Sequence, residues 1–165
     1  METRPFALLP GIVLAVLLIG LPVLAHDSAS ADRIEGVWNV EVTILSACGP
    51  TGVPIATVPA LNMFSHEGLL TEAPGTTLAP PPPILRGSPG LGTWQHLGGR
   101  HYSAVFTFFR LNPDNTFAGT QRITETIELS HDADSFTSTG TSETFDTNGT
   151  LIRAGCNTEA ATRAQ

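Results

Sequence analysis

Apolar and polar residues alternate with a period of two along most of the chain beyond residue 35. In the first such run, 36–44, the even-numbered residues from Trp38 to Ile44 are apolar and the odd-numbered residues between them are polar. Successive side chains of a strand point to opposite faces, so this pattern predicts a half-buried strand. Comparable patterns predict further strands over 57–66, 69–72, 92–97, 101–111, 117–130, 136–146 and 151–163, of which 69–72 is the weakest.

Short turn signals separate the later strands and indicate how they are connected. Residues 112–115 (Asn-Pro-Asp-Asn), the polar run 131–134 and the pair Asn148-Gly149 are typical of tight turns. Four successive strands from about residue 101 to residue 163 therefore form a meander. A sheet of this kind must hide its edges, and closure on itself does so. We predict an all-β fold, an antiparallel up-and-down β-barrel of seven or eight strands, with a two-sheet β-sandwich as the alternative.

Residues 73–90 interrupt this pattern. The segment contains Pro74, Gly75, the run Pro80–Pro83, Pro89 and Gly90. Proline removes a backbone donor, so such a segment does not pair as a central strand. We expect a long loop that belongs to a single domain over 36–165.

The first 25 residues resemble an export signal. A short basic start is followed by an uncharged apolar run to Leu24, and Gly20 and Pro22 break it before Val23-Leu24-Ala25. We expect cleavage after Ala25, a flexible arm over 26–35, and a secreted or periplasmic protein with no stable membrane insertion afterwards. Retention of this run as a membrane anchor is the alternative.

The two cysteines, Cys48 and Cys156, would both enter an oxidising compartment after export. An even cysteine count in such a protein predicts one disulfide. The pair has no CxxC spacing and no neighbouring histidine cluster, so no metal site is expected.

Composition and charge exclude further classes. The chain of 165 residues has a net charge of -7, and such an acidic balance argues against nucleic acid as a partner. Neither a P-loop nor a dinucleotide-binding fingerprint nor a Gly-x-Ser-x-Gly elbow occurs, so we expect no cofactor. The sequence does not fix the oligomeric state.

The first strand opens with Gly36-Val37-Trp38. In this motif, and in its predicted meander, the chain resembles the lipocalins and the wider calycin group. The resemblance implies that Trp38 plugs one end of a barrel and that an arginine near the last strand packs across its ring. Arg163 is the counterpart that we expect, and Arg153 is the other candidate. Such a contact contributes roughly 0.5–2 kcal/mol.

The aromatic strand 101–111 carries the best indication of a ligand. Tyr102, Phe106 and Phe108 share one face, and Gln121 and Ile123 lie on the next strand. We predict these five residues as ligand-binding residues of a hydrophobic cavity. A well-filled core is the alternative role for the same face.

Glu125 lies two residues after Ile123 in the strand predicted over 117–130, so the two side chains share one face of that strand. We expect it on the outer surface. If that face is interior, the carboxylate would need a partner such as Arg110 or Arg153, and it becomes the candidate catalytic acid or base.

These observations favour an exported barrel that binds a small apolar or amphipathic molecule, without catalysis. Two alternatives remain. One is an isomerase-like or cyclase-like enzyme that uses a carboxylate in the lumen. The other is a surface-interaction protein with a filled core, which predicts no internal cavity.

Overall fold

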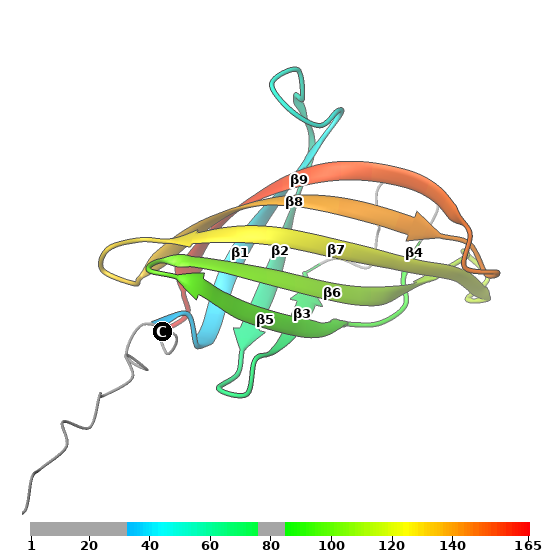
Figure 1. The fold of residues 1–165 in the computed structure, drawn as a ribbon. Helices are drawn as coiled ribbons and strands as arrows, with labels where there is room; N and C mark the ends of the chain where they lie inside the picture. Colours follow the sequence, from blue (N-terminus) through cyan, green and yellow to red (C-terminus); the bar gives the residue numbers. More distant parts are fainter. Residues whose placement is uncertain (1–32, 76–84) are drawn as a thin grey trace, which may run out of the picture.

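The computed structural model describes residues 33–75 and 85–165 (Figure 1). The predicted signal at 1–25, most of the predicted arm and the centre of the proline-rich segment lie outside these ranges. Within the described ranges the chain forms nine strands and no α-helix. The strands are β1 (Gly36–Leu45), β2 (Pro54–Phe64), β3 (Leu69–Pro74), β4 (Leu85–Arg86), β5 (Gly90–Gly98), β6 (His101–Leu111), β7 (Phe117–Leu129), β8 (Ser135–Phe145) and β9 (Leu151–Arg163).

These strands close into a barrel with eight sides, which confirms the predicted fold class. Each strand from β1 to β9 pairs antiparallel with its neighbour in the chain, except that β3 pairs with β5. The short β4 pairs with the far end of β6, beyond the part that β5 covers, so β4 and β5 together form one side. Pairing of β1 with β9 closes the ring. Hydrogen bonding is thus continuous around the barrel, and the sandwich alternative is wrong.

Two details of the strands differ from the sequence pattern. Pairing extends into both ends of the predicted loop at 73–90, because Pro74 pairs with Ala60 in β2 and Leu85 pairs with Leu111 in β6. A register shift near the start of β7 also places Phe117 opposite Leu111, on the outer face, where its ring packs edge-on against Phe109. The bulge places the side chain of Phe117 on the opposite face from the later odd-numbered residues of β7.

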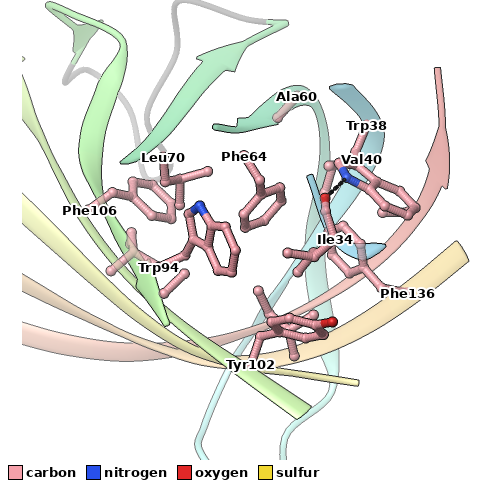
Figure 2. Packing of buried hydrophobic residues seen from close by; sticks show 14 of the residues in the cluster. Ile34, Trp38, Val40, Ala60, Phe64, Leu70, Trp94, Tyr102, Phe106 and Phe136 are labelled. Atoms are coloured by element: carbon pink, nitrogen blue, oxygen red, sulfur yellow. Dashed lines mark hydrogen bonds between the residues drawn. The ribbon is translucent and has the colours of Figure 1, made fainter. Parts of the chain in front are cut away.

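One end of the barrel, here called the aromatic end, is filled by large side chains (Figure 2). Trp38 and Phe64 each pack edge-on against Phe136, with ring centroids 5.0 and 6.0 Å apart, and Trp94 packs against both Phe64 and Tyr102. Such aromatic contacts add to the free energy gained by burial. This half of the lumen is a packed core.

Residues just before β1 belong to this core, although the sequence predicted an arm over 26–35. Ile34 is fully buried, and its carbonyl oxygen accepts a hydrogen bond of 2.8 Å from the indole Nε1 of Trp38. The dashed line in Figure 2 marks this bond. The arm prediction failed at this position because a single buried isoleucine has no periodicity that a sequence pattern could detect.

Arg163 seals the aromatic end. Its guanidinium carbon lies 4.3 Å from the centroid of the Trp38 ring, the contact that the resemblance to lipocalins implies. The same group donates hydrogen bonds to the backbone carbonyls of Arg33, Glu35 and Ala133. Gly36, with φ of 123°, lies where a Cβ would come within 2.8 Å of this guanidinium. Glycine at position 36 therefore suits both the backbone conformation and the close approach.

The predicted disulfide joins Cys48 to Cys156, with Cα atoms 5.3 Å apart. It links the segment after β1 to β9 at the opposite end of the barrel, here called the cavity end.

Candidate functional site

The lumen of the cavity end is hollow. It holds a cavity of about 110 Å³. Such a volume exceeds what one or two water molecules require. The lining residues come from all sides of the barrel and are Val42, Ile44, Leu45, Val58, Pro59, Glu72, Pro74, Arg86, Phe106, Phe108, Arg110, Gln121, Ile123, Ser142, Thr144, Arg153, Gly155, Cys156, Asn157 and Glu159. The filled-core alternative does not predict this space.

The walls of the cavity combine apolar and polar side chains. Phe106 and Phe108 from β6 project inward beside Ile123 of β7, and all three are buried. Val42 and Ile44 of β1 line the cavity as well. Inward-facing residues alternate with outward-facing ones on each strand, so the period-two pattern of the sequence places these side chains in the lumen.

A carboxyl pair lies between the aromatic core and the cavity. Glu125 and Glu159 are both almost fully buried, and their carboxyl groups lie close enough for each to shift the pKa of the other. The side-chain amide of Asn157 donates to Oε1 of Glu125 at 3.3 Å. Glu159 reaches the cavity wall, whereas Glu125 is not among the lining residues.

Burial sets the protonation of this pair. It raises the pKa of Glu125, and burial together with the charge of Glu125 raises the pKa of Glu159 well above its ordinary value of 4.5. Two carboxylates in one low-dielectric site cannot both ionise without a large free-energy cost. The pair therefore holds a proton to higher pH than two exposed carboxyl groups would, and Glu159 places it at the wall of the cavity.

A salt bridge lies in the wall nearby. The guanidinium of Arg86 binds both carboxylate oxygens of Glu72, and its carbon lies 3.6 Å from the centroid of the Phe108 ring. Both side chains are largely buried. The positive charge of Arg86 balances the negative charge of Glu72. The two side chains therefore form a fixed, polar part of the wall.

Two further arginines line the cavity, Arg110 of β6 and Arg153 of β9. Burial and the positive charge of Arg153 lower the pKa of Arg110. Within the described residues, neither guanidinium takes part in an ion pair, and Nε of Arg110 is buried without a hydrogen-bond partner.

Several other buried polar atoms along the lumen have no partner among the described residues. They are both side-chain atoms of Asn62, Oδ1 of Asn157, Oγ of Ser138, Nε of Arg86, and one oxygen each of Glu125 and Glu159. Buried polar groups are nearly always satisfied by protein, water or ligand. The lumen thus offers both donors and acceptors to a molecule that enters it.

The structure places most of the predicted ligand-binding residues at this cavity. Phe106, Phe108, Gln121 and Ile123 line it, whereas Tyr102 lies in the aromatic core against Trp94. Tyr102 shares the inward face of β6 with the two phenylalanines, but it is nearer the aromatic end. The alternation along the strand identified the face on which these side chains lie, but not their depth along the barrel.

The expectation that Glu125 lies on the outer surface is wrong. Its side chain has only 1% of its surface exposed. The partners also differ from the arginines that the sequence suggested, since Asn157 and Glu159 contact Glu125. Likewise Arg153, the alternative to Arg163 at Trp38, lies at the cavity.

Sequence reasoning missed Glu72, Arg86 and Glu159 as site residues. Glu159 lies between Asn157 and Ala161 on one face of β9, and all three are buried. Alternation with Thr158 and Ala160 was visible, but neither face is clearly apolar, so the pattern did not show which one points inward. Glu72 and Arg86 lie beside or within the proline-rich segment, where periodicity gives no signal.

No protein-family model matches this chain, and no curated protein matches its sequence. Among residues 33–75 and 85–165, no helix is long and apolar enough to cross a membrane. In the same ranges no group of three or more His, Cys, Asp or Glu side chains is arranged to hold a metal ion.

Proposed function

We propose that the protein is an exported binding protein that takes a small amphipathic molecule into the cavity of its barrel. The observation that carries this proposal is the cavity itself, in which apolar side chains lie beside buried polar atoms that lack partners among the described residues. Apolar pockets with a few convergent polar groups are the usual form of a small-molecule site. Export is supported by the signal-like pattern of residues 1–25 and by the disulfide between Cys48 and Cys156.

The two ends of the lumen support this assignment in different ways. The aromatic end supplies a packed core that does not depend on a ligand. The cavity end lacks such packing, and its apolar lining loses the dispersion contacts that a bound molecule would restore. Binding would therefore bury apolar surface of the ligand without rebuilding the barrel.

Occupancy of the cavity is tested with a solvatochromic apolar dye and with native mass spectrometry of the purified protein. Thr144 and Thr141 lie on the same strand, Thr144 buried and facing the cavity and Thr141 exposed on the outer face. We expect Thr144→Phe to fill the cavity and abolish saturable dye binding, and Thr141→Phe to leave binding unchanged. Equal dye binding by both variants and the native protein, with no small molecule retained, would refute the proposal.

The carboxyl pair favours a second candidate function, catalysis of proton transfer. Glu159 lines the cavity beside Glu125, and burial raises the pKa of Glu159, as is common for a carboxyl group that acts as a general acid or base. An isomerisation, in which one carbon of a bound carbonyl compound loses a proton and another gains it, needs no redox partner. Solvent deuterium incorporation into small ketones, measured by NMR and lost in Glu159→Gln, is the expected evidence. No incorporation above the buffer rate would eliminate this candidate.

A further inference from the structure

The two cavity-lining arginines that lack ion pairs, Arg110 and Arg153, carry a more specific conclusion about the ligand. They come from β6 and β9, which two other strands separate in the barrel, yet their charges interact. Both side chains line the same cavity, from different sides of the barrel. Arg110 is half-buried and Arg153 is exposed, and an anion between these two like charges would stabilise both.

The barrel does not supply that anion from its described residues. Glu72 is bound by Arg86, and neither Glu125 nor Glu159 forms an ion pair with Arg110 or Arg153. The remaining described arginine ion pairs are Arg100 with Glu128, whose carboxylate is exposed, and Arg122 with Glu143, whose carboxylate is half-buried. The buried Nε of Arg110 also lacks a hydrogen-bond acceptor.

This local excess of positive charge contrasts with the whole chain, whose net charge is -7. The protein as a whole would therefore not attract anions, and anion binding in the cavity would depend on these two arginines. The guanidinium group offers planar, paired donors that match a carboxylate. The apolar side chains of Phe106 and Ile123 lie in the same cavity and would contact a hydrocarbon body rather than a hydrated inorganic ion.

We propose that the cavity binds an organic monocarboxylate, with its carboxylate between Arg110 and Arg153 and its apolar body against Phe106 and Ile123. This inference rests on the proposed function, because it names the chemical class of the molecule that enters the cavity. It also assigns a specificity-determining role to two arginines whose charges would otherwise be a cost to the fold.

Isothermal titration with octanoate and with 1-octanol, which has the same chain length and no charge, tests the assignment. We expect octanoate to bind at least 10-fold more tightly than octanol, and Arg110→Gln to reduce octanoate affinity by 10- to 100-fold while octanol affinity stays within about 2-fold. Arg153→Gln alters an exposed side chain, so it reports on the site even if the Arg110 variant does not fold. Arg122→Gln, on the outer face of β7, is the matched control with the same loss of charge and should bind like the native protein.

The possible results separate the two proposals. Binding of octanol and octanoate with equal affinity, unaffected by Arg110→Gln and Arg153→Gln, would overturn the carboxylate assignment and leave the cavity as a general apolar site. Binding of neither molecule, together with absence of the dye signal described above, would overturn the proposed function itself. Equal loss of octanoate binding in the Arg122 variant would also overturn the assignment, because the effect would then follow from net charge.

Discussion

Removal of the Arg163 guanidinium should destabilise the barrel far more than removal of an arginine from its outer surface. Arg163 donates four hydrogen bonds to three backbone carbonyls and covers the Trp38 ring. A hydrogen bond from a charged group contributes roughly 1.5–3 kcal/mol, and an exposed one contributes less. Because Arg163 is only half buried, we take about 1 kcal/mol for each carbonyl and roughly 0.5–1 kcal/mol for the ring contact. Arg163→Met should thus lower the free energy of unfolding by about 3–4 kcal/mol.

Urea denaturation, followed by tryptophan fluorescence and far-UV circular dichroism, measures this loss. The control is Arg122→Met, which removes the same charge and an exposed bridge to Glu143. Exposed pairs of this kind contribute about 0.2–1 kcal/mol. Arg163→Lys keeps the charge but not the planar donors, so it should fall between the native protein and Arg163→Met. If Arg163→Met costs no more than Arg122→Met, the guanidinium does not seal the aromatic end.

Three other predictions follow from the described contacts. Replacing Cys48 and Cys156 together by serine should lower stability by about 4–5 kcal/mol in the chain-entropy account, because the bridge closes a long loop, and a thermal melt that is unchanged by the replacement would contradict this. The pKa of Glu159 is raised in the folded protein, so its folded form retains a proton that the unfolded chain loses above pH 4.5, and stability should fall as pH rises above that value. Glu159→Gln should flatten this decline while Glu128→Gln on the outer face should not, and parallel pH profiles of all three proteins would refute the assignment. Trp94→Phe should lower the free energy of unfolding by about 1–2 kcal/mol. It removes the hydrogen bond of 3.0 Å that the indole donates to the Ser65 carbonyl, and part of the aromatic packing. An unfolding midpoint equal to the native one would count against that role.

The cavity has acidic groups at one place, the carboxyl pair, and positive charge at another, the two arginines without ion pairs. Glu159 carries a buried carboxyl oxygen without a partner among the described residues, and this oxygen can accept a hydrogen bond. Arg110 and Arg153 present positive charge. A molecule with a carboxylate and a second polar group separated by hydrocarbon would satisfy both, whereas a wholly apolar molecule would leave both unsatisfied. We therefore expect an amphipathic ligand to bind in the cavity more tightly than a simple hydrocarbon.

The sequence by itself determined the fold class and most of the strands. Alternation with a period of two is a local property, since each residue of a strand faces opposite to the next. The strands from β6 to β9 were therefore predicted within a few residues of their observed bounds. The pairing of Cys48 with Cys156 followed from the cysteine count, and the role of Arg163 followed from a resemblance based on Gly36-Val37-Trp38.

Only the tertiary structure decided which polar residues meet inside the barrel. Glu125 and Glu159 lie on different strands, and nothing in either strand shows that closure brings their carboxyl groups into contact. The expectation that Glu125 is exposed followed the general rule that single carboxylates avoid burial, and its raised pKa reduces that penalty because the neutral form is favoured. Likewise, the convergence of Arg110 and Arg153 depends on the register of four strands around the ring. Parity fixes the face of a side chain, but barrel closure and register fix its depth and its neighbours.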